Sequence, residues 1–151
     1  METTTYVGEI IVNYKKSKSK KVMPKLDAIN SQGVVNWVKS FLFPDIGYRE
    51  RFIVLFYDTA HNPIGFTTMS LGIDKASLVC PKMVAQHCLL CNASNVILFH
   101  NHPSGNLLPS EQDRKITKAI KSALELLSVS VNDHIILSAD GHYSFLDMGV
   151  L

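Results

Sequence analysis

Two short and almost wholly apolar runs limit most strongly what this chain can fold into. Residues 52–57 read FIVLFY, and residues 95–100 read NVILFH. A strand with one face in water alternates apolar and polar residues, whereas an uninterrupted apolar run is typical of a strand that is covered on both faces. The two runs therefore predict a sheet that lies between layers of helices.

The spacing of apolar residues predicts three helices, over residues 31 to about 42, about 81–91 and 110 to about 127. Ser31 and Ser110 are candidate N-caps, because a serine hydroxyl can accept a hydrogen bond from an N–H of the first helical turn. Pro81 suits the first turn of the middle helix, where its missing N–H costs no hydrogen bond. Further strands are predicted at residues 6–14, 64–69, 134–138 and 142–145.

The order of these elements predicts a single α/β domain with three layers, α/β/α, around a mixed sheet. We assign residues 1–151 to this domain, with a core over about 30–151 and an N-terminal strand and lysine-rich loop over 1–29. Five lysines within residues 15–21 are too charged to pack, so we expect this segment to be solvated. The strand at 6–14 could pair with a second copy of the chain, so a homo-oligomer is compatible with the sequence.

The composition excludes several classes of protein. At 151 residues, with 46% apolar and 19% charged residues, the chain can bury a core without disulfides. A formal net charge of +2 does not call for nucleic acid, and three cysteines cannot all pair within the chain, which favours reduced thiols. The sequence shows neither a signal peptide nor an apolar run near the ~20 residues that span a bilayer. We therefore expect a cytoplasmic protein without a membrane partner.

A pair of histidines at the end of the second apolar run indicates a metal site. Residues i and i+2 of a strand point to the same face, so His100 and His102 can bind one ion. A turn follows, and the chain enters a helix at Ser110, which brings Asp113 back on the first helical turn. A tetrahedral zinc ion held by two imidazoles and a carboxylate keeps a fourth position for water. The spacing therefore predicts an open His-His-Asp zinc site of the hydrolytic type.

Glu50 is the candidate base for such a site, because a zinc-activated water needs an acceptor for its proton. It lies just before the apolar run at 52–57, at the start of a predicted strand. Each residue also has an ordinary structural interpretation: Ser110 and Asp113 match a helix-capping pattern, and histidines near a turn are often merely solvated. The combination at one strand-loop-helix junction favours the metal site.

Other candidate residues are assigned to structure. Cys88 and Cys91 share a helix face, where cysteine commonly packs as a small apolar residue, and Cys80 is also assigned to packing. His134 and His142 are expected to bond the backbone or a neighbouring carboxylate. A zinc deaminase needs H-x-E before P-C-x-x-C, which this chain lacks. The letters His-Asn-His do not make an HNH nuclease, whose motif is spread over a long hairpin.

The spacing of the site residues resembles a known family. His100-x-His102, with seven residues to Ser110 and two more to Asp113, resembles the JAMM (MPN+/JAB) metalloprotease motif. The string HNHPSG at residues 100–105 resembles the RadC branch of that superfamily. The resemblance covers most of residues 30–151. Supporting segments are Arg49-Glu50-Arg51-Phe52, Val54-Leu55, Asp58-Thr59, Asp133-His134 and Gly141-His142-Tyr143-Ser144-Phe145.

This resemblance implies a cytidine-deaminase-like α/β/α fold and hydrolysis of a peptide or isopeptide bond in a protein substrate. It implies zinc bound by His100, His102 and Asp113, a water polarised by Glu50, and an oxyanion stabilised with the help of Ser110. Longer RadC members carry an N-terminal segment that resembles a helix-hairpin-helix DNA-binding module, and we expect this chain to be a short form without it. DNA binding, which the family's repair label suggests, is therefore weakly supported.

Two classes of function remain open. The first is a zinc metallohydrolase of the peptidase or isopeptidase type. Glu50 and Ser110 favour it, because a purely structural zinc site needs neither. The second is a non-catalytic module that binds nucleic acid or protein and retains a structural zinc site. In that case the lysines of residues 15–21 would give salt-sensitive binding to DNA.

Overall fold

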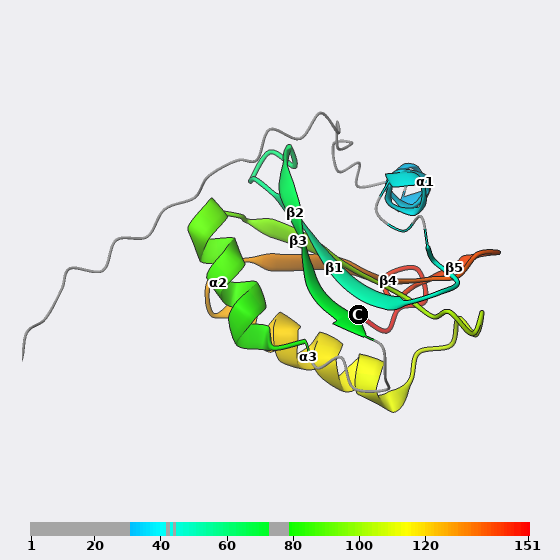
Figure 1. The fold of residues 1–151 in the computed structure, drawn as a ribbon. Helices are drawn as coiled ribbons and strands as arrows, with labels where there is room; N and C mark the ends of the chain where they lie inside the picture. The colour runs from blue at the N-terminus through cyan, green and yellow to red at the C-terminus, as the bar shows by residue number, and fades with distance from the viewer. Residues whose placement is uncertain (1–30, 42, 44, 73–78) are drawn as a thin grey trace, which may run out of the picture.

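The computed structural model describes residues 31–41, 43, 45–72 and 79–151 (Figure 1). Its five strands form one mixed sheet in the order β2-β1-β3-β4-β5. The strand predicted at residues 6–14, the lysine-rich segment at 15–21 and Leu42 lie outside the described residues. The elements are α1 (Ser31–Phe41), β1 (Glu50–Tyr57), β2 (Pro63–Gly72), α2 (Pro81–Cys91), β3 (Asn95–Asn101), α3 (Glu111–Glu125), β4 (Ser130–Leu137) and β5 (His142–Ser144).

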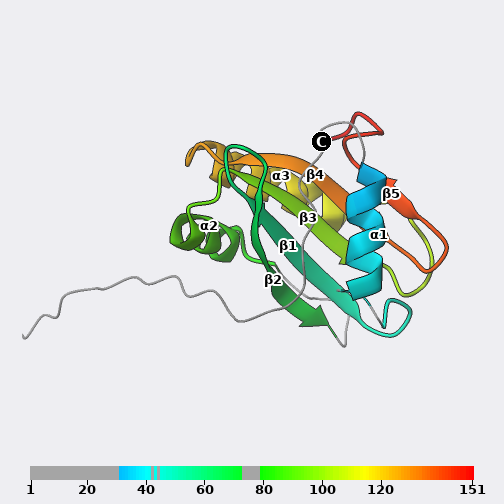
Figure 2. The same ribbon diagram turned by 90° about the horizontal axis from the view of Figure 1, so that it is seen from above.

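Helices cover both faces of the sheet, with α1 on one face and α2 and α3 on the other (Figures 1 and 2). β1 pairs antiparallel with β2 and β3, β3 pairs parallel with β4, and β4 pairs antiparallel with β5. Parallel neighbours need a crossover connection, and α3 provides it between β3 and β4. The predicted three-layer α/β/α fold with a mixed sheet is confirmed.

Alternate residues of β1 fill both layers of the core, which explains its uninterrupted apolar run. Ile53 and Leu55 are fully buried in a cluster with Val34 and Val38 of α1. The intervening residues point to the opposite face, because successive side chains of a strand alternate. There they join a second cluster with apolar residues of α2 and α3. This cluster includes Phe52, Val54, Phe56, Val84, Cys88, Ile120 and Leu124.

The strands and helices differ from the predicted ranges mainly at their ends. β1 begins at Glu50, ahead of the apolar run, because its exposed first residue still pairs with β2. β4 begins at Ser130, since Val131 pairs with β3 and is buried. α3 ends at Glu125 rather than near 127, where Ser128 follows with a left-handed φ of 56°. Apolar patterns mark buried residues, so they miss polar ends that are held by backbone pairing alone.

The cysteines of α2 and its N-cap differ in their surroundings. Cys88 is buried, and this burial, together with the nearby Cys91, raises the pKa of its thiol to about 12. The assignment of Cys88 to packing agrees with this burial. The assignment of Cys80 to packing is wrong, because this residue is exposed. It is the N-cap of α2 and directly precedes Pro81, at a helix start that lies at the surface.

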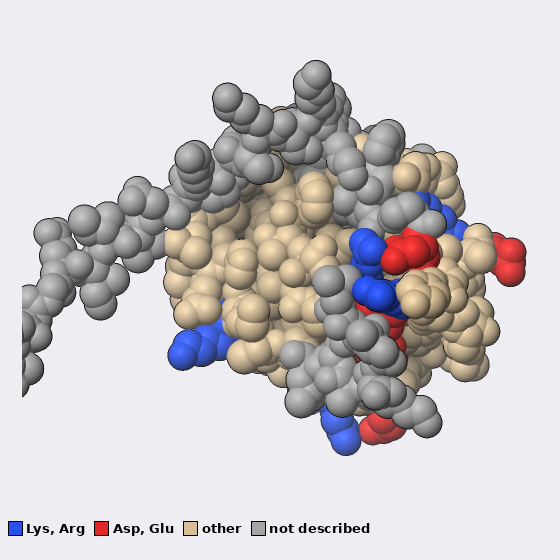
Figure 3. Space-filling view, in the orientation of Figure 1, with Lys and Arg blue, Asp and Glu red and all other residues tan. Residues whose placement is uncertain are grey.

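The surface over β2 and α2 carries little charge. β2 has no Lys, Arg, Asp or Glu, and α2 has only Lys82 among these residue types. Figure 3 shows this part of the surface as mostly uncharged, with Lys, Arg, Asp and Glu side chains gathered toward the other side of the view. None of the described helices has the length and apolar character needed to cross a membrane.

Candidate metal centre

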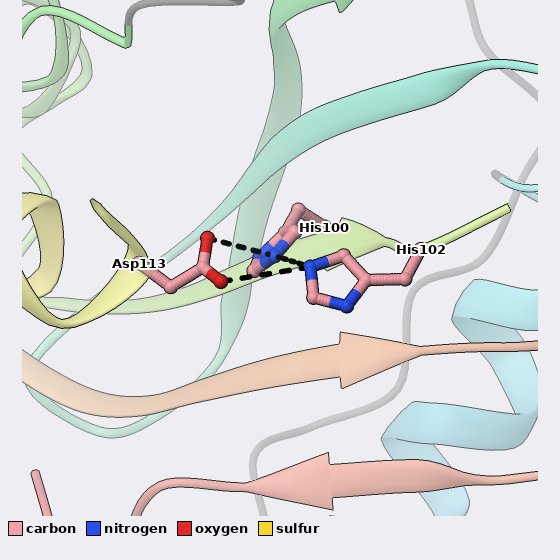
Figure 4. A group of neighbouring side chains, drawn as sticks. All are labelled: His100, His102 and Asp113. Carbon is pink, nitrogen blue, oxygen red and sulfur yellow. Dashed lines mark hydrogen bonds and ion pairs between the residues drawn. The ribbon is translucent and has the colours of Figure 1, made fainter. Parts of the chain in front are cut away.

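His100, His102 and Asp113 converge where β3 ends and α3 begins (Figure 4). The His100 Nε2 lies 2.8 Å from the His102 Nε2 and 3.2 Å from the Asp113 Oδ1. The His102 Nε2 lies 3.6 Å from the Asp113 Oδ2. One ligand atom from each residue thus lies within 4.8 Å of the others. The structure brings together the three residues that the sequence predicts as metal ligands.

The turn after β3 orients His102. Its backbone N–H donates to the Leu137 carbonyl at 2.8 Å, and its Nδ1 lies 2.6 Å from the Asn106 carbonyl oxygen. A carbonyl oxygen only accepts, so Nδ1 carries a proton and Nε2 faces Asp113. The turn requires Gly105, which has φ 83°, a left-handed conformation that glycine adopts without steric cost.

Ser110 and Asp113 cap α3 and at the same time shape the ligand cluster, which consists of His100, His102 and Asp113. The Asp113 N–H donates to the Ser110 hydroxyl at 3.1 Å, and the Ser110 N–H donates to the Asp113 Oδ2 at 2.6 Å. The Ser110 hydroxyl also donates to that oxygen, at 2.6 Å. The capping and metal-site interpretations of these residues are therefore compatible, because the cap fixes the carboxylate beside the two imidazoles.

The ligand cluster shifts the pKa values of its members. Burial by itself would raise the pKa of the Asp113 carboxyl, but hydrogen bonds with His100, His102 and Ser110 hold it well below its usual range. The hydrogen bond with Asp113 raises the pKa of His102 against the effect of burial, and Asn106 and the charge of Glu50 raise it further. His102 therefore holds its proton more tightly than a free imidazole, and metal binding at its Nε2 would release that proton.

Glu50 lines the same cleft as the ligand cluster. Phe52 pairs with His100 in the antiparallel register of β1 and β3, and continuing this register by two residues brings Glu50 opposite His102. The cleft has a volume of about 450 Å³, within the usual range of small-molecule sites. The structure thus brings Glu50 and Ser110 to the predicted ligands. Apolar parts of the lining come from Phe52, Val79, Pro81, Ile116 and Ala119.

Asn101 fixes the backbone on both sides of Glu50, a role the sequence did not reveal. It is the last residue of β3, between His100 and His102, and it is fully buried with its side chain pointing to the α1 face. Its amide oxygen accepts from the Arg51 N–H at 2.8 Å. Its amide NH₂ donates to the Arg49 carbonyl at 2.7 Å and to the Ile46 carbonyl at 2.6 Å. A polar residue inside a run that is buried on both faces was the available signal.

His134 of β4 contacts the ligand cluster through His100. The sequence predicts a structural histidine that bonds the backbone or a neighbouring carboxylate, whereas the His134 Nε2 lies 2.8 Å from the His100 Nδ1. Its Nδ1 lies 2.6 Å from the Thr117 hydroxyl of α3. Burial, followed by the nearby His100, lowers the pKa of His134 well below its usual value. The sequence gives no sign of this contact, since β4 and β3 meet only in the folded sheet.

The donor set fits zinc. Zinc in hydrolytic sites is commonly held by three side chains drawn from histidine and acidic residues, with a fourth position for water. Here two imidazole nitrogens and one carboxylate converge at the wall of a cleft. His100 is buried while His102 and Asp113 are half-buried, so the cluster is anchored on one side and accessible on the other.

Comparison with known proteins agrees with this geometry. The RadC-like JAB domain family matches residues 29–150. A UPF0758 protein of Thermotoga maritima is 45% identical over 106 residues, which are 69% of this chain and 48% of that protein. A UPF0758 protein of Haemophilus influenzae is 42% identical over 112 residues, which are 73% of this chain and 51% of that protein.

A third relative, from Pseudomonas fluorescens, is 44% identical over 103 residues, which are 68% of this chain and 46% of that protein. The chain thus spans about half the length of the curated relatives it matches. The name that these relatives share, UPF0758 protein, states no activity. The extent of the family match and the identity to these relatives show that the chain belongs to the RadC-like JAB domain family.

Proposed function

We propose that this chain is a zinc-dependent hydrolase that cleaves a peptide or isopeptide bond in a protein substrate. The observation that carries the proposal is the shared cleft of Glu50 with His100, His102 and Asp113. A structural zinc site requires four protein ligands and no base, whereas here three candidate ligands and a carboxylate face one opening. Membership of the RadC-like JAB domain family supports the same reaction class.

His100, His102 and Asp113 would hold the ion. Zinc, when bound there, supplies a Lewis acid that lowers the pKa of water towards ~7 and polarises a carbonyl. Glu50 accepts the proton of the attacking water and then donates it to the departing amine nitrogen, so the carboxylate is regenerated. The exposed position of the Glu50 side chain allows it to reach both atoms in turn.

Ser110 lies at the rim of the cleft, where its hydroxyl donates to the Asp113 Oδ2. Once a cation competes for that oxygen, the hydroxyl can turn towards the cleft. A hydroxyl that donates to the developing oxyanion stabilises the transition state more than the planar ground state. We therefore assign Ser110 to oxyanion stabilisation.

Metal content tests the first half of the proposal. We expect the purified protein to bind about one zinc ion per chain, because the cluster offers one set of ligands. The double variant His100→Ala/His102→Ala should bind none at this site. Zinc titration followed by elemental analysis measures both. A wild-type protein that binds no metal at the cluster would refute a zinc hydrolase.

Glu50→Gln tests the second half. The amide is isosteric but cannot accept the proton, so zinc content should stay at the wild-type level while turnover falls by roughly 10²–10⁴-fold. Turnover is measured on a library of fluorogenic peptides and of peptides joined through lysine isopeptide bonds. Glu111→Gln is the matched control, since Glu111 lies in the same region but faces Lys115 at the surface. Equal turnover in Glu50→Gln and the wild type would reject Glu50 as the base.

A non-catalytic binding module is the competing outcome of the same experiments. It predicts zinc bound at the cluster with no cleavage of any library member. Over the described residues in the view of Figure 3, no broad basic patch favours nucleic acid as its partner. This face of the described residues therefore gives no separate support to a DNA-binding function.

A further inference from the structure

Two buried polar residues lie directly behind the ligand cluster. His134 of β4 is fully buried, and Thr117 of α3 is 4% exposed. They form a continuous chain with His100, because 2.8 Å separates the His100 Nδ1 from the His134 Nε2 and 2.6 Å separates the His134 Nδ1 from the Thr117 hydroxyl. Neither residue belongs to the predicted set of ligands and catalytic groups.

The direction of each hydrogen bond follows from the far end of the chain. The Thr117 hydroxyl lies 2.5 Å from the Asp113 carbonyl oxygen, which can only accept, so the single hydroxyl hydrogen is used there. The Thr117 oxygen must then accept from the His134 Nδ1–H. A neutral imidazole that donates from Nδ1 accepts at Nε2, so the His100 Nδ1 must be the donor in the last bond.

We propose that His134 and Thr117 are positioning residues that hold His100 in the tautomer whose Nε2 is unprotonated and free to bind zinc. A ligating histidine usually donates its second N–H to a carboxylate, a backbone carbonyl or water, and such partners fix the ring and raise its affinity for metal. Here the acceptor is another imidazole, that of His134. The Asp113 carbonyl sets the tautomer of His134 through the Thr117 hydroxyl. The proposal rests on the proposed function only for the identity of the ion.

Aromatic rings surround the contact between His100 and His134. The His134 ring stacks on Phe145 at 4.8 Å between centroids, and Phe52 lies 5.5 Å away on a tilted ring plane. Phe52 also stacks on His100 at 5.9 Å. Aromatic rings offer no carbonyl or carboxylate to the His100 Nδ1–H, and His100 itself is 2% exposed. Loss of the His134 nitrogen would leave this donor buried without a strong acceptor.

Zinc affinity of matched variants tests the proposal. His134→Phe suits the aromatic surroundings but removes the acceptor, and we expect its zinc Kd to rise by about 10–100-fold. His134→Gln keeps an acceptor oxygen and should recover part of this loss. Thr117→Val keeps the shape of the side chain but frees His134 to change tautomer, so a smaller rise is expected. His87→Phe is the control, because His87 bonds Met83 within α2 and should leave the Kd unchanged.

Competition with a chromogenic chelator gives each Kd, and thermal unfolding of the zinc-free proteins shows that each variant is folded. Wild-type affinity in folded His134→Phe would overturn the proposal. A uniform loss in His134→Phe, His134→Gln and Thr117→Val together with the His87→Phe control would also overturn it, since the effect would not depend on the acceptor.

Nitrogen-15 NMR of the histidine-labelled wild-type protein tests the same chain without any variant. We expect His134 to be protonated on Nδ1 and unprotonated on Nε2. We also expect a scalar coupling through the hydrogen bond between the His100 Nδ1 and the His134 Nε2. A His134 that carries its proton on Nε2 would overturn the proposal even in zinc-free protein. A wild type that binds no zinc but shows this coupling would instead refute the proposed hydrolase and leave the hydrogen-bond chain established.

Discussion

His100 is 2% exposed at the end of β3, whereas Glu50, on the neighbouring strand, has an exposed side chain at the start of β1. The members of the ligand cluster are each held through their side chains. His100 contacts His134, His102 contacts Asn106, and Asp113 contacts Ser110. At Glu50 it is the backbone that is held, because Asn101 bonds the residues on either side.

The difference fits the two chemical tasks that the proposed hydrolase requires. Metal ligands must keep one geometry through the whole reaction, so side chains that are locked by hydrogen bonds serve them best. A group that takes a proton from one atom and gives it to another must reorient between them, so a fixed backbone with a mobile side chain serves it best. Substitutions in the ligand cluster and substitutions that affect Glu50 should therefore separate metal affinity from turnover.

The largest effect is expected from Asp113→Asn. This change removes the only acidic ligand from the cluster while keeping the shape of the side chain, so we expect the zinc Kd to rise at least ~100-fold, or about 3 kcal/mol. Chelator competition measures the change. Glu111→Gln, in the same helical turn, should leave the Kd within about twofold because Glu111 is exposed. Near-wild-type affinity in Asp113→Asn would remove Asp113 from the ligand set.

Asn101→Leu should affect the region of Glu50. It leaves the Arg51 N–H and the Arg49 and Ile46 carbonyls without their buried partner, so we expect the free energy of unfolding to fall by about 2–3 kcal/mol. Turnover should fall because Glu50 loses its fixed backbone, while the zinc Kd changes little. Chemical denaturation and chelator competition provide the two readouts. A loss of zinc affinity as large as that in Asp113→Asn would show that the ligand cluster and the region of Glu50 do not act independently.

The pH dependence of stability should reveal the buried side of the ligand cluster. Burial, together with His100, lowers the pKa of His134 in the folded chain. Below about pH 6.5, His134 is therefore protonated in the unfolded chain but stays neutral in the folded chain. Stability is thus present above that pH and is lost as the pH falls towards the folded pKa. We expect zinc-free wild type to lose about 1.4 kcal/mol per pH unit more than His134→Phe between pH 6 and 5. Identical slopes would place the imidazole of His134 in contact with solvent.

Ser110→Ala should give the smallest effect on stability. It removes the hydroxyl that accepts from the Asp113 N–H, and loss of such a cap costs about 1 kcal/mol of stability. Ser110→Thr keeps the hydroxyl and should retain most of the stability. Thermal unfolding of the zinc-free proteins compares the two. If Ser110→Ala were as stable as the wild type, the cap would not contribute to holding Asp113 beside the histidines.

Local patterns allowed the sequence to predict the ligand cluster. The two histidines share a strand face by simple alternation, and a capping pattern places Asp113 in the first turn of the next helix. The position of Glu50 could not be derived from a local pattern. Its approach to His102 depends on the register of β1 against β3, which a single sequence does not specify. His134 and Thr117 come from elements that meet only through tertiary packing, so no spacing rule could connect them to His100.

The alternation of β3 has a mechanical consequence. β3 and the residue that follows it carry the two imidazoles on one face, and Asn101, on the opposite face, bonds the backbone at the start of β1. A displacement of β3 along its axis therefore carries the ligands and the backbone of Glu50 together. Thermal motion of the sheet should therefore leave the separation between the two histidines and the backbone of Glu50 nearly constant.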